Sequence, residues 1–198
     1  SGREDVRYFL KWCANNVLQS IVTDDFGCSY FLSYSTRVVG KAHLFGDNNL
    51  IWRHDMNDDR DDWKAQVDFM ADMRSITYYN RFLYLEYSTD AGTKYRIGKI
   101  DADTGVFTKI NFDMSQLPAN VQVYCAKIST INGMIYFGSV GHTVYEFYPD
   151  GRYSRTYQDI VTAYEAGVVE NVHADKNGHV YAICINQDDR SSAVVRYD

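Results

Sequence analysis

The 198-residue chain concentrates acidic side chains in one short run that ends in a tryptophan. Within it, Asp55, Asn57 and Asp59 match the D-x-N-x-D ligand spacing with which a calcium-binding loop begins. Arg60 then stands where that loop needs glycine, and Gln66 stands where it needs a bidentate glutamate. We therefore expect no metal here, and the run is either a solvated helix cap or an acidic surface that docks a basic partner. The candidate surface consists of Asp55, Asp58, Asp59, Asp61, Asp62 and Trp63.

Three basic or titratable side chains form a second candidate site. Arg74, Lys127 and His173 fall on comparable segments of an internal repeat, and we predict that these segments line a central channel. Their charges would then converge on an anion. The alternative is that the three side chains point into packed layers or hydrogen-bond to backbone carbonyls.

The chain carries no recognisable catalytic arrangement. None of its five histidines lies near a G-x-S-x-G or H-E-x-x-H pattern. Asp72 and Glu170 are the best candidates for the paired carboxylates of a glycosidase, but the predicted channel is narrow. We therefore predict no catalytic residue, no enzyme activity and no cofactor, and keep a glycoside hydrolase as a third alternative.

These side chains must be positioned by a repeated element, because four segments share one pattern. In each segment a β-branched residue begins a short strand, a polar or glycine-containing turn follows, and a second apolar strand carries a tyrosine. The segments are IVTDDFGCSYFLSY from Ile21, ITYYNRFLYLEY from Ile76, ISTINGMIYFGS from Ile128 and VHADKNGHVYAICI from Val172, with Tyr30, Tyr84, Tyr136 and Tyr181.

A third and a fourth strand complete each unit of the repeat. An apolar residue ends the third strand and an aspartate follows three positions later, in the turns FGDNN, DADTG and YPDG. Another strand then begins with LIWRH, VFTKI or RYSRTY. Four short antiparallel strands in roughly 45 to 55 residues are typical of the blade of a β-propeller.

The fourth repeat lacks its last strand, which we expect the N-terminal segment VRYFLKW, residues 6–12, to supply. The repeat tyrosines are 54, 52 and 45 residues apart, and the interval across the two termini is 47, so the ring closes arithmetically. A strand from the opposite terminus removes the last exposed edge of such a ring. The sequence thus predicts an all-β, four-bladed propeller of four-stranded antiparallel blades, in a single domain over residues 1–198. Its blades are approximately residues 14–57, 70–113, 120–160, and 166–198 with 6–12.

Short helices are expected in the connectors between blades. Residues 58–73 place Trp63, Val67 and Met70 at helical spacing after an Asp-rich start. Two shorter candidates are residues 113–117 and 158–166.

Composition favours strands and limits the partners. The chain has 21 Asp but only 5 Glu, together with 17 Tyr, a bias that suits strands joined by tight turns. A net charge of −6 argues against binding to nucleic acid, and no apolar run reaches membrane-spanning length. The four cysteines form no C-x-x-C pair, and the sequence shows no signal peptide and no N-x-S/T sequon. We therefore expect buried thiols in an intracellular protein, cytoplasmic or nuclear.

The tyrosine-bearing strands and the Asp/Gly turns resemble those of β-propeller repeat proteins. In blade number and length the chain is also similar to hemopexin-type domains, but it lacks their Asp-Ala-x-Phe start, so no hemopexin ligand or metal is carried over. A propeller without a catalytic set typically presents a rigid face of loops. We predict a non-catalytic scaffold that binds a protein or peptide, with a basic partner and self-association as options. The alternative is a carbohydrate-binding propeller, for which the tyrosines offer aromatic faces.

Overall fold

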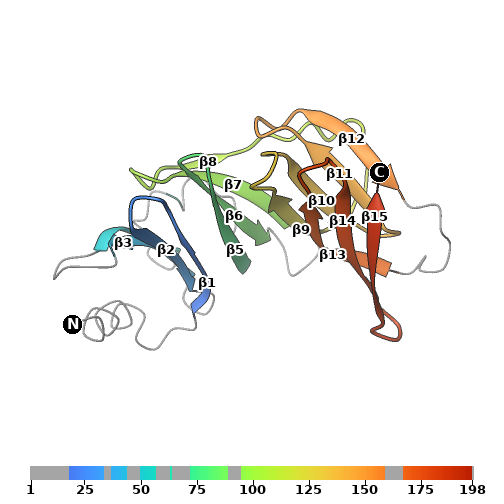
Figure 1. Cartoon of the computed structure of the whole chain (residues 1–198), viewed down its shortest axis with the longest axis horizontal. Coiled ribbons are helices and arrows are strands. Elements are labelled where there is room, and N and C mark those ends of the chain that lie inside the picture. The colour runs from blue at the N-terminus through green and yellow to red at the C-terminus, as the bar shows by residue number, and fades with distance from the viewer. Residues whose placement is uncertain are drawn as a thin grey trace. The chain divides into compact units, whose positions relative to one another are not determined.

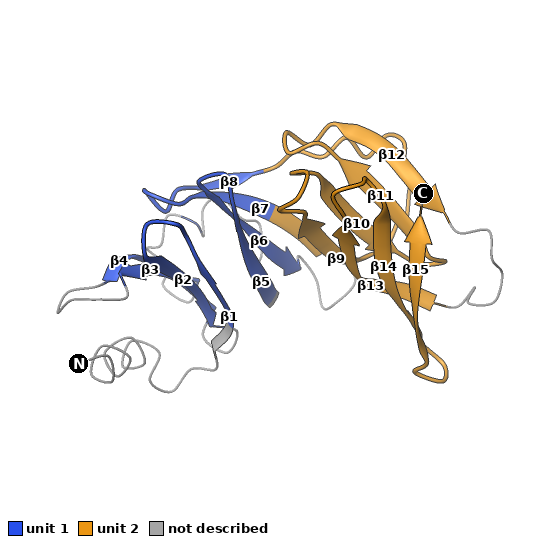
Figure 2. Ribbon diagram, in the orientation of Figure 1, with its two compact units in different colours: residues 1–89, 98–109 blue, residues 90–97, 110–198 orange. Residues whose placement is uncertain are grey.

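The architecture is built from antiparallel strands. A computed structural model describes residues 18–33, 37–43, 50–56, 63, 72–88, 95–158 and 167–197. All regular elements in these ranges are β-strands (Figure 1). The chain divides into two compact units, unit 1 with residues 1–89 and 98–109, and unit 2 with residues 90–97 and 110–198 (Figure 2).

Unit 1 contains two sheets of four strands, and in each sheet the strands follow chain order. Its first sheet consists of β1 (Leu18–Thr23), β2 (Cys28–Ser33), β3 (Val38–His43) and β4 (Leu50–Asp55). Its second sheet consists of β5 (Asp72–Tyr79), β6 (Phe82–Ser88), β7 (Tyr95–Asp101) and β8 (Phe107–Lys109). The boundary between the units runs through β7, whose first three residues cluster with unit 2.

Unit 2 contains one sheet of four strands and one sheet of three described strands. The four-stranded sheet consists of β9 (Val123–Ile128), β10 (Ile135–Ser139), β11 (Thr143–Phe147) and β12 (Tyr153–Gln158). The three-stranded sheet consists of β13 (Gly167–Ala174), β14 (Val180–Asn186) and β15 (Ser192–Tyr197).

Two of the hairpins use the same turn, Asp-x-x-Gly-x-x-Tyr, which begins at Asp24 and at Asp175. The backbone N–H of each aspartate donates to the carbonyl four residues later, at 3.0 Å and 2.9 Å. Gly27 and Gly178 have φ of 80° and 90°, a left-handed conformation in which glycine avoids the Cβ clash of other residues. Local sequence therefore sets both turns.

Within each unit, the first strand of one sheet lies beside the first strand of the next. In unit 1, β1 contacts β5, and the backbone N–H of Ile76 donates to Ser20 Oγ at 3.3 Å. In unit 2, β9 contacts β13, while Val140 and Val168 form an isolated antiparallel bridge. Consecutive sheets that meet at their first strands are the arrangement expected of neighbouring propeller blades.

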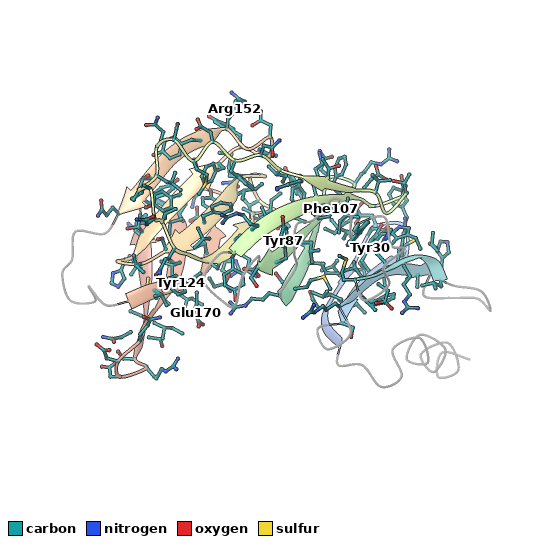
Figure 3. The ribbon with its side chains drawn as sticks, turned by 180° about the vertical axis from the view of Figure 1, so that it is seen from behind. Tyr30, Tyr87, Phe107, Tyr124, Arg152 and Glu170 are labelled. Carbon is teal, nitrogen blue, oxygen red and sulfur yellow. The ribbon has the colours of Figure 1, made fainter. Side chains whose placement is uncertain are left out.

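Aromatic rings fill much of each core. In unit 1 the Phe107 ring packs against Trp63 at 5.4 Å and against Tyr87 at 6.2 Å between ring centroids; Figure 3 labels Tyr87 and Phe107. In unit 2 the Phe137 ring lies 4.6 Å from Phe112 and 4.9 Å from Phe147. Tyrosine and phenylalanine rings in the described part of the chain therefore serve packing between strands.

The strand prediction is confirmed at the level of an all-β fold of consecutive antiparallel sheets. Each described sheet lies inside one of the four repeat segments, and the single domain remains a prediction. The closing strand predicted at residues 6–12 lies outside the described residues. In the described part of the chain, Cys28, Cys125 and Cys184 are buried thiols, as expected.

The helix prediction is wrong at residues 113–117. They form a turn, in which Leu117 N–H donates to the Met114 carbonyl and the Asp113 carboxylate accepts from the Ser115 N–H and hydroxyl. An aspartate that bonds its own backbone competes with helix formation. The last two residues of the predicted helix at 58–73 belong to β5. The rest of that segment, apart from Trp63, and residues 159–166 lie outside the described residues.

Candidate functional site

Three hairpin turns of unit 1 surround a hollow of about 320 Å³, which we call the turn-end hollow. The turns join β1 to β2, β5 to β6 and β7 to β8. The residues that line the hollow are Asp24, Phe26, Tyr78, Arg81, Ala102 and Asp103.

The β1–β2 turn is held by the carboxylate of Asp24. One oxygen, Oδ1, accepts from the backbone N–H groups of Phe26 and Cys28, both at 2.9 Å, and Oδ2 accepts from the Tyr30 hydroxyl at 2.8 Å. Burial raises the pKa of Asp24, but these hydrogen bonds outweigh burial and keep that pKa below its usual range. The locked turn carries Phe26, which is 79% exposed.

The β5–β6 turn presents a cation. Asn80 and Arg81, the two central residues, have φ of 49° and 67°, as in a type I′ turn. Glycine is the usual second residue of such a turn, and here it is arginine. The Arg81 guanidinium donates to Asp103 Oδ2 at 2.6 Å.

The β7–β8 turn presents an acid. Asp101 Oδ1 accepts from the backbone N–H groups of Asp103 and Thr104, at 3.0 Å and 2.8 Å, and so orders the turn. The Asp103 carboxylate lies between Arg81 and Lys41, whose ammonium is 3.4 Å from Oδ1. Hydrogen bonds from Arg81 and Lys41 hold the pKa of Asp103 below its usual range.

Aromatic rings lie behind these charges. The Tyr30 ring stacks on Tyr78 with centroids 5.6 Å apart and an interplanar angle of 15° (Tyr30 is labelled in Figure 3). Burial raises the pKa of the Tyr78 phenol, and the carboxylates of Asp24, Asp25 and Asp103 raise it further. The hollow is therefore an aromatic surface with an excess of negative charge around it.

The acidic run predicted as a docking surface is only partly described. The Asp55 carboxylate accepts from Arg53 at 2.6 Å, while Asp58, Asp59, Asp61 and Asp62 lie outside the described residues. Trp63 is 1% exposed, donates from Nε1 to the Gly105 carbonyl at 2.9 Å, and stacks on His54 at 4.2 Å. Trp63 is thus a core residue, and its side chain is not presented to a partner.

The three channel candidates do lie on first strands, but only two of them share a register position. Lys127 pairs with Tyr136 and His173 pairs with Tyr181, so each faces a repeat tyrosine. Arg74 falls at a register shift between Met73 and Ser75 and is exposed. In β5 the position that pairs with the repeat tyrosine, Tyr84, is occupied by Thr77, so Arg74 lies three residues before the register position that Lys127 and His173 share.

The remaining clusters of polar side chains fit structural roles. No three His, Cys, Asp or Glu side chains gather as potential metal ligands in the described part of the chain. Glu146 is buried, but its carboxylate accepts from Ser154 at 2.7 Å, Arg155 at 3.1 Å and Tyr157 at 2.8 Å. Burial raises the pKa of Glu146, yet these partners outweigh burial and lower it, which suits a structural carboxylate.

The turn-end hollow was missed by sequence reasoning. Its signals were present, because Asp24 begins an Asp-x-x-Gly-x-x-Tyr turn that leaves Phe26 at the tip, and Asn80 and Arg81 occupy a two-residue hairpin loop. The sequence alone did not indicate that Tyr78 and Asp103 lie beside them, since that depends on the packing of two sheets.

Comparisons with known proteins reveal no family. No protein-family profile and no curated protein matches the chain. Among solved structures, the chain is similar to the extracellular domain of a putative hybrid two-component system from B. thetaiotaomicron, with a TM-score of 0.53 and 12% identity. That likeness covers 89% of this chain and 23% of the other.

Two further solved structures were matched. One is the extracellular domain of a putative one-component system from B. thetaiotaomicron, with a TM-score of 0.51 and 14% identity over 90% of this chain and 25% of that one. BamB from Moraxella catarrhalis aligns with a TM-score of 0.48 and 10% identity, over 91% and 54%, too weak a likeness for an argument. The chain spans about a quarter of the length of either extracellular domain.

The likeness to the two extracellular domains concerns the fold alone. With the sheets that meet at their first strands, it supports a β-propeller-like fold and confirms that part of the sequence prediction. Closure of the ring and the number of blades remain predictions. A search of the described residues for a helix able to cross a membrane found none.

Proposed function

We propose that the chain is a non-catalytic interaction module that binds a protein or peptide through the turn-end hollow of unit 1. The observation that carries this proposal is the exposure of Phe26, 79%, at the tip of a turn that Asp24 holds rigid. Aromatic side chains that are already ordered dominate binding energy at interfaces, because little conformational entropy is lost on contact.

The charges around the hollow favour a basic partner. In addition to burial, the pKa of Tyr78 is raised by three carboxylates, those of Asp24, Asp25 and Asp103. A fourth, Asp101, lies in the same turn as Asp103. The cations in the described surroundings are Arg81 and Lys41, which both bind Asp103. A partner with a lysine or arginine beside an apolar residue would complement both the acidic excess and the Phe26 ring.

The proposal is tested with an array of short peptides that differ in net charge and apolar content, followed by fluorescence polarisation with the best binder. We expect basic peptides with an apolar residue to bind, and Phe26→Ser to weaken binding about 30-fold, as for a hot-spot residue. The matched control is Ile131→Ser, because Ile131 is 58% exposed on a hairpin turn of unit 2.

Equal losses in the two variants, or no binding by any basic peptide, would contradict the proposal. The intracellular location and self-association stay predictions from the sequence. The described residues offer no geometry in favour of the glycosidase alternative, since Glu170 is exposed in β13 and the Asp72 side chain is not described.

A further inference from the structure

A second hollow, of about 460 Å³, lies in unit 2 between the connector that precedes β9 and the ends of β10 to β12. We call it the neutral hollow, because none of the described residues that line it is charged, although 23% of the chain is charged. Its lining is Gln116, Pro118, Asn120, Val121, Gln122, Ser139, Val140, Thr143, Tyr145, Thr156 and Gln158.

The floor of the neutral hollow consists of hydroxyl groups on paired strands. Ser139, Thr143 and Tyr145 are buried, and Ser139 donates to the Gln122 carbonyl at 2.6 Å. Tyr145 is 6% exposed, and its hydroxyl makes no hydrogen bond to the described residues. A phenol is protonated at neutral pH and can donate to a ligand, and burial raises the pKa of Tyr145 further above that pH.

Amide groups form the walls. The side chains of Asn120 and Gln158 are exposed and make no hydrogen bond in the part of the chain that the structure describes. The side-chain oxygen of Gln122, Oε1, accepts from the Tyr124 hydroxyl at 2.9 Å, which leaves the side-chain amide nitrogen of Gln122 able to donate. Each amide offers donors and an acceptor in one plane.

We propose that the neutral hollow binds an uncharged carbohydrate. Sugar hydroxyls both donate and accept hydrogen bonds, so they match a lining of amides and hydroxyls, and Pro118, Val121 and Val140 offer apolar contact to sugar C–H groups. A charged ligand would find no partner for its charge among the lining residues.

An extended peptide is less suited to this place. Peptides commonly bind by adding a strand to an open sheet edge. Two of the strands under the neutral hollow are already paired on both sides, since β10 lies between β9 and β11, and β11 lies between β10 and β12, whereas β12 is the outermost described strand of the sheet. Over β10 and β11 the hollow thus offers side-chain groups in place of a backbone edge, and the inference is independent of the function proposed for unit 1.

The experiment is a glycan array that carries neutral, sialylated and sulfated oligosaccharides, probed with the whole 198-residue chain. Isothermal titration with the strongest neutral binder follows. We expect neutral glycans to be bound in preference to acidic ones, and Tyr145→Phe to weaken the binding about tenfold through loss of one hydrogen bond. Its unfolding midpoint should stay that of the wild type, because the hydroxyl has no protein partner among the described residues.

The matched control is Tyr148→Phe, which removes a hydroxyl from a tyrosine that is 39% exposed and does not line the neutral hollow. This variant and Phe26→Ser should bind the glycan with unchanged affinity. The proposal is overturned if no neutral glycan binds at millimolar concentration, if acidic glycans bind as well as neutral ones, or if Tyr145→Phe and Tyr148→Phe have the same effect.

Discussion

Two tyrosines at equivalent positions, one in each unit, lie beside opposite charge patterns. In unit 1, Tyr30 donates to Asp24 in the preceding turn and pairs across the sheet with Lys41, whose ammonium lies 5.4 Å from the Tyr30 ring. In unit 2, Tyr136 pairs with Glu146, and Asn132 of the preceding turn donates to the Tyr136 hydroxyl at 2.8 Å. Each tyrosine has one carboxylate beside it, which comes from the preceding turn for Tyr30 and from the third strand for Tyr136.

In these two sheets the charge of the turn complements the charge of the third strand. Where the third strand brings a cation, the turn supplies an aspartate, and where the third strand brings Glu146, the turn supplies a neutral asparagine. The last sheet follows the pattern of unit 1, since Tyr181 pairs with Arg196 and donates to Asp175 at 3.4 Å. Two carboxylates around one buried phenol would repel each other and leave its oxygen without a donor.

The largest effect should come from removing the buried carboxylate of unit 2. Glu146→Ala leaves the Tyr157 hydroxyl without its acceptor and Arg155 without its ion pair, and we expect a loss of ~3 kcal/mol in the free energy of unfolding. Urea unfolding followed by circular dichroism measures it. Glu170→Ala, which removes an exposed glutamate of the same unit, is the control and should change little.

If Glu146→Ala lowers the free energy of unfolding no more than Lys41→Ala does, the proposed difference between the two units is wrong. Lys41 pairs with an Asp103 that is 60% exposed, so its removal should lower the free energy of unfolding by ~1 kcal/mol.

Removal of the tyrosine hydroxyl should lower stability by different amounts in the two Asp-x-x-Gly-x-x-Tyr turns. Tyr30→Phe removes a 2.8 Å hydrogen bond from a buried phenol to a carboxylate, and should lower the free energy of unfolding by ~2 kcal/mol. Tyr181→Phe removes a longer bond of 3.4 Å from a half-buried side chain and should have a smaller effect. Equal losses by urea unfolding would show that the shared pattern, rather than burial, sets the energy.

A direct test of the one-carboxylate rule is Asn132→Asp. The new carboxylate would replace the amide donor of Tyr136 opposite Glu146, and we expect a loss of ~1 to 2 kcal/mol at pH 7. The folded-state pKa of the new acid would be raised, so the loss should fade as pH drops and the acid becomes protonated. Asn132→Asp combined with Glu146→Gln should recover part of the stability, and additive losses would contradict the rule.

The smallest effect concerns acid titration of the turn in the last sheet. The hydrogen bond from the His179 side chain lowers the pKa of Asp175, and hydrogen bonds from backbone N–H groups lower it further, from 3.8 to about 2. A carboxyl with a lowered folded pKa stabilises the fold above pH 3.8, and this contribution is lost as pH falls towards 2. NMR titration of the Asp175 carboxyl carbon measures the pKa, and His179→Gln should raise it; an unchanged pKa would exclude the His179 contact as its cause.

The hairpins could be predicted because turn chemistry is local. Asp-x-x-Gly-x-x-Tyr carries its own hydrogen bonds, so the strands on either side of Asp24 and Asp175 are recognisable from a few residues. The position of Trp63 could not be predicted, because an acidic run suggested a surface, whereas its burial depends on His54 in the preceding strand and on Gly105, 42 residues away. The neutral hollow is similar, since its lining comes from separate strands and a connector.

The left-handed backbone conformation of Arg81 has a consequence for how this position evolves. Glycine would relieve the backbone strain of that turn, so selection for stability alone would favour Arg81→Gly. Under our proposal for unit 1, this substitution would give a more stable protein that has lost part of its binding surface. Libraries selected for heat resistance and libraries selected for binding should therefore diverge at this position, and sequencing both would show whether it is kept for function.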